Sequence, residues 1–371
     1  MSGHNSKGRV IVGLSGGVDS AVAALLLLKE GYEVIGVFMK NWEDDSPECT
    51  TENDQRDARL VADTLGIPFY TFNFVKEYWD HVFTYFLETY AAGQTPNPDV
   101  LCNKEIKFKA YLEKAMQLDA DYIATGHYAR IDREEPGEEH PLGVRLLKGV
   151  DPGKDQSYFL YAVPGTALVK SLFPLGQLRK KEVRELAKNA GLHNWDRKDS
   201  VGICFIGERK FKTFLEGYLP GKSGDMVDPE GDVKARHDGL MFYTIGQRQG
   251  LGIGGPGAPW FVADKDLEKN ELLVVQGGDH PLLFSDGLTC SGMTLISGEL
   301  PDLPFTCTAK IRYRQPDQNC TVVKQEGESW IVHFNRPQKA VSAGQSIVFY
   351  DGEVCLGGAV IDAPLNLDPK R

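Results

Sequence analysis

The string Ser15-Gly16-Gly17-Val18-Asp19-Ser20 constrains this chain more than any other feature because of where it lies. It follows the apolar run Val10–Leu14, which predicts a β-strand, and precedes Ala21–Lys29, whose Ala and Leu residues predict a helix ended by Gly31. Two adjacent glycines let the backbone turn tightly, and the amides at the start of a helix favour an anion. The string therefore predicts a phosphate-binding turn between a strand and a helix.

The residues around this turn alternate between strand and helix patterns. Strands are predicted at 34–39, 69–74 and 122–125, and helices at 52–65, 76–92 and 104–117. Such alternation is typical of a doubly wound, mainly parallel sheet of the Rossmann-like α/β class. Ligands of these sheets bind at the carboxyl ends of the strands, where Ser15–Ser20 lies.

The α/β pattern fades after about residue 205. A charged, proline-bearing segment at 134–141 predicts the tip of a hairpin before that point. Short strands with turn signals between them follow from about residue 285, and they predict a small β-barrel or sandwich. We therefore expect a catalytic α/β domain, a small mixed central domain and a C-terminal β-barrel, with the bounds 1–205, 206–283 and 284–371.

The charges are unevenly distributed. The formal net charge of −11 argues mildly against a nucleic-acid partner, yet residues 179–212 carry ten Lys and Arg against five acids. On charge alone, a solvated helix face is the simpler interpretation of this run. The polar start Met1–Arg9 and the lack of an apolar stretch of ~20 residues predict a cytoplasmic protein without membrane contact.

Seven cysteines are scattered without a C-x-x-C pair, which argues against a zinc ribbon and a thioredoxin-like motif. Cys102 ends the string Asn97-Pro98-Asp99-Val100-Leu101-Cys102 at the expected head of a helix, where the helix terminus and Lys104 or Lys107 would lower the pKa of the thiol. Cys204 lies in an apolar stretch with basic residues on both sides. Judged by pattern alone, cysteines of both kinds are more often inert packing residues.

Two other glycine motifs predict loops. Gly250–Gly255 satisfies G-x-G-x-x-G, but Pro256 and Pro259 exclude the helix that a dinucleotide site needs. The tripeptide Gly221-Lys222-Ser223 looks like the end of a Walker loop, but Glu216 stands in the place of its first glycine.

The loop at 15–20 resembles the motif of the PP-loop ATP pyrophosphatase superfamily, whose members cleave ATP between the α and β phosphates and adenylylate a substrate. Five further strings are similar, in order, to the signatures of the bacterial tRNA-specific 2-thiouridylase family. They are Gly93–Asn103, Ala124–Ala129, Lys154–Phe159, Gly202–Gly207 and Thr244–Arg248. The similarity runs from about residue 9 to 361.

This resemblance implies an enzyme that transfers sulfur to C2 of the wobble uridine of tRNA, through adenylylation of the uridine O2 and a cysteine persulfide. It implies ATP as cofactor, and Mg²⁺ is expected with it on chemical grounds. The expected partners are tRNA acceptors for Lys, Glu and Gln, and either a sulfur-relay protein or a cysteine desulfurase as persulfide donor. A monomer is expected.

The resemblance also implies roles for individual residues. ATP would be bound by Gly13, Leu14, Ser15, Gly16, Gly17, Val18, Asp19, Ser20, Met39 and Gly126. The flipped target base would contact Asn97, Pro98 and Asp99. The tRNA would contact Lys154, Asp155, Gln156, Arg312 and Tyr313. Cys204 would carry the persulfide, Cys102 would be its partner and Asp99 the general acid or base, with no protein metal site.

The chemistry explains why such residues would be needed. Uridine O2 is a poor leaving group until AMP is attached to it, and a second cysteine can then cleave the persulfide that supplies the sulfur. Two alternatives remain at this stage. Another PP-loop enzyme, such as an amidotransferase-type synthetase or the lysidine-forming tRNA ligase, needs no cysteine pair. A non-catalytic RNA- or nucleotide-binding module would have a decayed loop, whereas this loop is complete.

A second basic feature lies at 306–314, which the pattern predicts as a strand. In a strand, Lys310, Arg312 and Arg314 would share one face and Tyr313 the other. From the residues alone, this face is as well explained by a solvated barrel exterior as by RNA contact.

Overall fold

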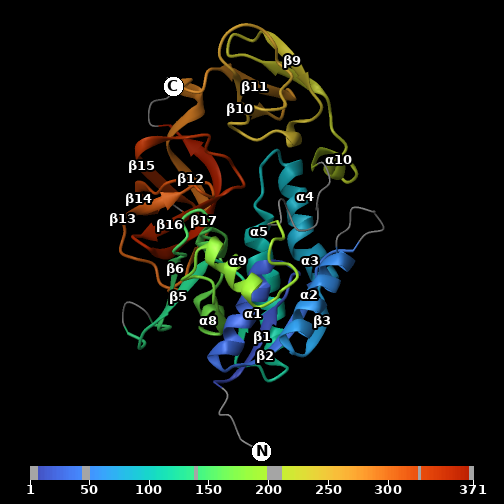
Figure 1. Cartoon of the computed structure of the whole chain (residues 1–371). Coiled ribbons are helices and arrows are strands. Elements are labelled where there is room, and N and C mark those ends of the chain that lie inside the picture. Colours follow the sequence, from blue (N-terminus) through green and yellow to red (C-terminus); the bar gives the residue numbers. More distant parts are fainter. Residues whose placement is uncertain (1–6, 44–50, 138–140, 199–210, 325–326, 367–371) are drawn as a thin grey trace, which may run out of the picture.

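The computed structural model describes residues 7–43, 51–137, 141–198, 211–324 and 327–366. Figure 1 shows three blocks: an α/β block that contains the N-terminal half of the chain, a small sheet around β8–β11, and a barrel around β12–β17. The order of these blocks confirms the predicted fold class. Among the described residues, no helix is long and apolar enough to cross a membrane.

The α/β block is built on a five-stranded parallel sheet with the order β3-β2-β1-β4-β7. Its strands are β1 (Arg9–Gly13), β2 (Glu33–Lys40), β3 (Phe69–Asn73), β4 (Tyr122–Ala124) and β7 (Ser171–Leu172). The chain builds the sheet outward from β1 in both directions, so the order reverses between β1 and β4. This reversal creates a crevice at the carboxyl ends of these two strands, where ligands of such sheets bind.

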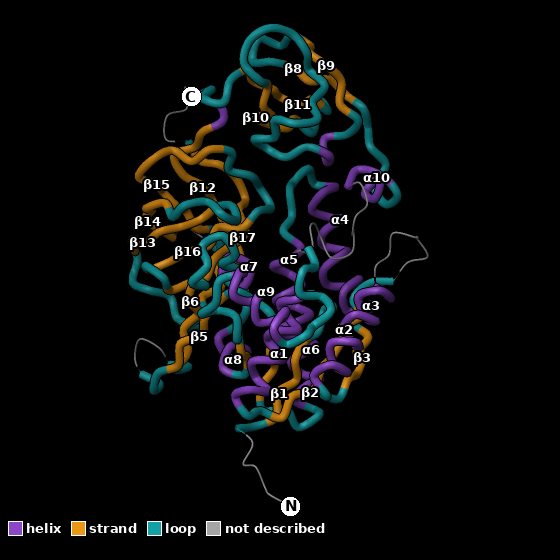
Figure 2. The backbone as a smooth tube through the Cα atoms, in the orientation of Figure 1, coloured by secondary structure: helices purple, strands orange, loops and turns teal. Residues whose placement is uncertain are grey.

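Alternate residues of β1 belong to two different cores, as the two-residue period of a strand requires. Val10 and Val12 pack with α1 (Val18–Glu30), α2 (Thr51–Leu65) and α9 (Lys180–Asn189). Ile11 packs into the second core, on the other face of the sheet. Helices therefore cover both faces, as Figure 2 shows in purple.

The second core contains a run of short helical segments. They are α3 (Val75–Tyr78), η1 (Trp79–Phe83), α4 (Thr84–Ala91), α5 (Pro98–Leu101), η2 (Cys102–Ala110), α6 (Tyr111–Met116), α7 (Ser157–Leu160) and α8 (Gly165–Val169). The segments η1 and η2 are π-helical, a form that is frequent at functional sites. The helix predicted at 104–117 begins earlier, because Pro98 takes the first helical position after Asn97.

The central sheet has the order β10-β11-β8-β9. It is formed by β8 (Gly224–Val227), β9 (Val233–His237), β10 (Trp260–Asp266) and β11 (Glu271–Gln276), and it is flanked by α10 (Phe211–Glu216) and the 3-10 turn η3 (Leu240–Phe242). The sequence predicts only a mixed region here. In β9 a single residue is buried, so its residues do not alternate between buried and exposed positions, which is the pattern by which a strand is predicted. Residues 250–259 form neither helix nor strand, so the predicted loop is confirmed.

The C-terminal block is a closed antiparallel barrel, which confirms the prediction. Six strands follow the order β12-β15-β14-β13-β16-β17, and pairing of β12 with β17 closes the ring. They are β12 (Phe284–Leu295, after the 3-10 turn η4, Pro281–Leu283), β13 (Phe305–Lys310), β14 (Gln318–Lys324), β15 (Trp330–Lys339), β16 (Ser346–Asp351) and β17 (Val354–Leu365).

A hairpin from the α/β half of the chain extends the barrel sheet. Its strands, β5 (Ala129–Arg133) and β6 (Val144–Lys148), confirm the hairpin predicted around 134–141. The strand β6 pairs with β17, where Cys355 lies opposite Leu146. This pairing was not predicted, because period-two patterns mark a strand without naming its neighbour.

The strand predicted at 306–314 ends at Lys310, so the predicted common face of Lys310, Arg312 and Arg314 is wrong. The physical reason is a turn: the amide of Ile311 donates to Oε1 of Gln315 at 2.9 Å, and Arg314 has a φ of 65°. The side chain of Arg312 is consequently drawn inward. It donates to the carbonyls of residues 245 and 340 at 2.8 and 2.9 Å, and so joins the central block to the barrel.

Candidate functional site

The turn between β1 and α1 is shaped by its own hydroxyl groups. The amide of Ser15 donates to Oγ of Ser20 at 3.1 Å, and that hydroxyl donates to the carbonyl of Gly17 at 3.1 Å. Gly17 is the N-cap of α1 and has no side chain with which to cap the helix. The start of α1 therefore presents backbone amides and the positive end of a helix dipole at the carboxyl edge of the sheet.

Asp19 is held from two sides. Its carboxylate accepts from Nζ of Lys180 at 2.7 and 2.8 Å and from the hydroxyl of Tyr128 at 2.7 Å. Lys180 is the first residue of α9, and Tyr128 follows β4. Both contacts fix the first turn of α1 relative to the place between β1 and β4 where the strand order of the sheet reverses. Lys180 also brings a positive charge to the predicted phosphate-binding turn of residues 15–20 (the phosphate turn).

Gly16 is held in a backbone conformation that favours glycine. Its φ is +78°, and a Cβ there would lie 2.6 Å from the carbonyl oxygen of Asp54. Its own carbonyl accepts from Nδ2 of Asn194 at 2.8 Å and from a guanidinium nitrogen of Arg197 at 3.1 Å. The same guanidinium pairs with Asp54 and, at 2.7 Å, with Asp57.

Two cations of the basic run at 179–212 are thus committed to the phosphate turn. Lys180 binds Asp19, and Arg197 joins Gly16 to α2. The interpretation of this run as a solvated helix face does not hold for these two residues. The composition of residues 179–212 indicates a basic segment, but only the fold shows which of its lysines and arginines contact residues 15–20.

Other predicted ATP residues gather at the same crevice. A Cβ on Gly126 would lie 2.7 Å from the amide nitrogen of Ser20, so the loop after β4 approaches α1 as closely as glycine allows. A Cβ on Gly13 would lie 2.8 Å from Cε of Met39, near the end of β2. The structure therefore brings the predicted ATP residues together from three strand ends, and their contact with ATP stays a prediction.

The segment from Asn97 to Cys102 lies in the second core. Asn97 precedes α5, and Asp99 in its first turn is partly buried. Burial raises the pKa of the Asp99 carboxyl, and the positive charge of Lys107 opposes this effect. Cys102 is 1% exposed and lies one turn inside the helical run, beyond the first turn in which a helix dipole acts most strongly. Cys204 lies outside the described residues.

Two buried polar residues adjoin this segment. Asn103 donates from Nδ2 to the carbonyl of Phe159 at 2.9 Å, while its Oδ1 has no hydrogen-bond partner among the described residues. His127 lies 2.7 Å from the hydroxyl of Thr125, and burial together with the charge of Lys107 holds the pKa of its imidazole well below the usual range. His127 is therefore neutral near pH 7. Only its place in the string 124–129 could have drawn attention to it.

The loop that leads into Asn97 is held from outside the α/β block. Nζ of Lys265 on β10 donates to the carbonyl of Gly93 at 2.7 Å. The side-chain amide of Gln345 donates to the carbonyls of Thr95 and Pro96 at 2.9 and 3.2 Å. Central sheet and barrel thus both position the entry to α5, which neither strand patterns nor motifs predict.

The residues predicted to contact tRNA occupy different environments. Asp155 is buried and accepts from the amides of residues 149 and 157, and Gln156 accepts from the amide of Tyr128 at 2.9 Å. Lys154 is partly exposed. The ring of Tyr313 lies 4.5 Å from that of Phe159, between centroids. Asp155 and Gln156 therefore shape the loop that carries Lys154, and RNA contact by this group stays a prediction.

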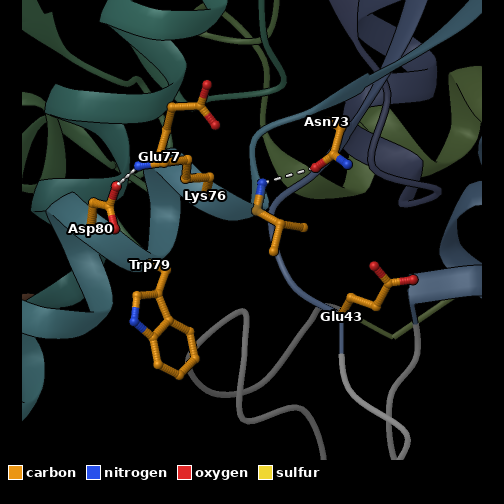
Figure 3. A pocket seen from close by; sticks show the side chains of 7 residues that line it. Glu43, Asn73, Lys76, Glu77, Trp79 and Asp80 are labelled. Atoms are coloured by element: carbon orange, nitrogen blue, oxygen red, sulfur yellow. Dashed lines mark hydrogen bonds and ion pairs between the residues drawn. The ribbon is translucent and has the colours of Figure 1, made fainter.

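A hollow of about 590 Å³ opens beside the ends of β2 and β3. Figure 3 shows Trp79 and Glu43 on different sides of it, with Lys76 turned toward Asp80 and Asn73 accepting from the amide of residue 75. Three carboxylates line this hollow against a single lysine. An ATP triphosphate would be repelled there, so the crevice at the phosphate turn is the better candidate.

The chain is similar to known proteins along nearly its whole length. Family models match in three parts: the tRNA methyl transferase HUP domain at residues 8–208, its PRC-barrel domain at 212–276, and the aminomethyltransferase beta-barrel domain at 285–361. The tRNA-specific 2-thiouridylase of Alkaliphilus oremlandii is 57% identical over 362 residues, covering 96% of this chain and 98% of the relative. The thiouridylase of Geobacillus kaustophilus is 57% identical, covering 98% of this chain and 97% of the relative. That of Hydrogenovibrio crunogenus is 55% identical, covering 96% of this chain and 94% of the relative.

The chain belongs to the tRNA-specific 2-thiouridylase family. The family models carry the words methyl transferase in their descriptions, whereas the full-length relatives carry the name thiouridylase. Because the relatives match nearly the whole chain at more than half identity, their name describes this thiouridylase more closely. Its HUP-domain match contains the phosphate turn, Asp99, Cys102 and Cys204.

We expect Asp19→Asn to lower pyrophosphate release that depends on ATP and tRNA by roughly 10- to 100-fold, because charge-assisted hydrogen bonds contribute about 1.5–3 kcal/mol. The change removes the ion pair with Lys180 that fixes the first turn of α1. Release of pyrophosphate under single-turnover conditions measures it. The exposed Asp63→Asn on α2 is the matched control, and equal rates in the two variants would contradict the role of Asp19.

We expect the stability difference between Asp99→Asn and the unsubstituted chain to depend on pH. A raised pKa means that the folded chain binds this proton more tightly than the unfolded chain. Stability from this group is therefore complete below about pH 4 and lost as the pH rises through the raised pKa. Urea unfolding should show that Asp99→Asn gains relative stability between acid and neutral pH. A stability difference that stays constant over this pH range would refute this.

We expect Gln345→Ala to lower the free energy of unfolding by about 1–2 kcal/mol, since each lost hydrogen bond contributes about 1 kcal/mol. It should also slow tRNA modification, because the loop before Asn97 loses two of its hydrogen bonds to the barrel and keeps the one from the amide of Thr95 to the carbonyl of Ala343. Urea titration and product analysis measure the two effects. Gln318→Ala, whose side chain donates to the carbonyl of Pro316, is the control. If Gln345→Ala modifies tRNA at the same rate as Gln318→Ala, the loop before Asn97 does not depend on its hydrogen bonds from Gln345.

Proposed function

We propose that this thiouridylase forms 2-thiouridine at the wobble position of tRNA, using ATP to activate the oxygen that sulfur replaces. The observation that carries the proposal is the packing of one helical run against β1. The hydroxyl of Tyr111 donates to the carbonyl of Ile11 at 2.9 Å. The run that contains Asp99 and Cys102 is thereby fixed on the strand that ends in the phosphate turn.

ATP binds with its phosphates at the start of α1 in this proposal. The amides of the turn and Lys180 supply positive charge where pyrophosphate departs. Mg²⁺ would come with ATP and would neutralise part of the charge on its phosphates. Among the described residues, no group of three His, Cys, Asp or Glu side chains could hold a metal ion, and Asp19 is the carboxylate within the turn.

The uridine O2 attacks the α phosphorus of ATP, and pyrophosphate leaves. Sulfur then attacks C2, the C2–O2 bond breaks and AMP departs with the former O2. We assign the persulfide to Cys204. Cys102 attacks its inner sulfur, so the terminal sulfur is transferred and a Cys102–Cys204 disulfide remains for reduction.

Asp99 is the residue that we propose as general acid or base. Its raised pKa brings the carboxyl closer to the working pH, which favours proton transfer. Asn97 and Pro98 begin the same segment and would contact the flipped base. The tRNA would lie across Lys154 and the Arg312–Tyr313 turn, because Lys154 lies close enough to Tyr313 for its charge to act on the phenol of that residue.

The acceptors are proposed to be the tRNAs for Lys, Glu and Gln, and the donor of the persulfide a sulfur-relay protein or a cysteine desulfurase. The chain would act as a monomer in the cytoplasm, where tRNA and reduced thiols occur together. These partners follow from the family and from the chemistry of the proposed persulfide.

We expect Cys102→Ser and Cys204→Ser each to abolish 2-thiouridine, because each removes one sulfur of the proposed exchange. Both should still release pyrophosphate in a first turnover, since adenylylation precedes sulfur attack. Mass spectrometry of tRNA nucleosides measures the product. Cys290→Ala, in the barrel strand β12, should retain it. Persistent 2-thiouridine in both serine variants would favour a PP-loop enzyme that needs no cysteine pair.

We expect Lys154→Ala to weaken tRNA binding and to reduce the slope of log affinity against log salt by about one, as the loss of a phosphate contact does. Filter binding at several salt concentrations measures the slope. Lys29→Ala is the matched control, because α1 ends at the opposite edge of the parallel sheet and Lys29 is exposed there. A slope equal to that of the control would place Lys154 away from the RNA.

A further inference from the structure

Two cysteines lie side by side on neighbouring strands of the barrel. Cys307 on β13 and Cys320 on β14 are directly opposite in the antiparallel register, and their sulfur atoms are 3.6 Å apart. Both belong to the barrel core, where Cys320 is 2% exposed and Cys307 is partly buried. Neither has a part in the proposed sulfur transfer.

We propose that Cys307 and Cys320 form a reversible dithiol–disulfide pair, a modification site that accepts low-molecular-weight disulfides as the oxidant. Residues directly opposite in antiparallel strands have Cα atoms about 4.5–5.5 Å apart, within the range that a disulfide bridges. The sulfur atoms must approach from 3.6 Å to about 2.05 Å. Side-chain rotation and a small backbone adjustment suffice for that approach.

The difference in burial sets the order of the reaction. The oxidant reaches Cys307 first, because Cys320 is closed to solvent and its contact with Cys307, together with burial, raises its pKa. The Cys307 thiolate attacks the small disulfide and releases one thiolate. Cys320 then loses its proton and attacks the Cys307 sulfur, which releases the second. Two protein thiols are oxidised, and one small disulfide is reduced to two thiols.

The pair lies close in sequence to the contacts that join the central block to the barrel. β13 ends three residues after Cys307, and Arg312 follows with its hydrogen bonds to the central block. A cross-link between β13 and β14 would fix the base of this turn. The site is independent of the proposed function, so failure of either proposal leaves the other standing.

The test uses the full chain, incubated with oxidised glutathione, alkylated and digested with trypsin under non-reducing conditions. Lys310, Arg312 and Arg314 lie between the two cysteines, which therefore fall in separate peptides. We expect one species that joins these peptides, about 2 Da lighter than their sum, and its loss after reduction. Alkylation of both thiols, or a glutathione adduct that stays on Cys307, would overturn the proposal.

Cys290 provides the matched control, because it is a third buried thiol of the same barrel core. Cys290→Ser should retain the cross-link, and this variant also removes ambiguity, since Cys290 and Cys307 share a tryptic peptide. Cys307→Ser should leave Cys320 as a thiol. Linkage of Cys320 to Cys290 in the unsubstituted chain would contradict the pairing. The peptide assignment in that chain decides the matter even if a variant does not fold.

Discussion

The carboxylate of Asp19 is the point on which the phosphate turn depends. Lys180 and Tyr128 hold it from α9 and from the loop after β4, so the first turn of α1 is fixed to the place where the sheet order reverses. An ion pair that is largely removed from water is costly unless both charges are well bonded. Here the ion pair of Asp19 and Lys180 keeps the lysine beside the positive end of α1. In the proposed function, this positive charge stabilises the departing pyrophosphate.

The second half of the candidate site depends on contacts between the blocks. The α/β block supplies Asp99 and Cys102, but the loop before them is held by Lys265 from the central sheet and by Gln345 from the barrel. Arg312 joins those two blocks to each other. The C-terminal half of the chain therefore positions the segment that is proposed to react, in addition to any contact that it makes with RNA.

The sequence predicted what local physics determines. Val10–Leu14, the double glycine and the helix that follows form one local unit. Alternation of strand and helix patterns predicted the parallel sheet, and short strands with turn signals predicted the barrel. Contacts between distant residues could not be predicted in this way. No pattern links Lys180 to Asp19, or Leu146 to Cys355, because periodicity describes a residue's own element and not its partner. The turn after Lys310 was not predicted, because basic and other residues continue to alternate as far as Arg314, although the strand ends at Lys310.

The central claim is that ATP activates the very oxygen that sulfur replaces. It is tested most directly with tRNA whose wobble uridine carries a heavy-oxygen label at O2, incubated with the enzyme, ATP and a persulfide donor. If O2 is adenylylated, the C2–O2 bond breaks with AMP as the leaving group, and the label appears in AMP in equal amount to the 2-thiouridine formed. Unlabelled AMP accompanied by 2-thiouridine would contradict the account.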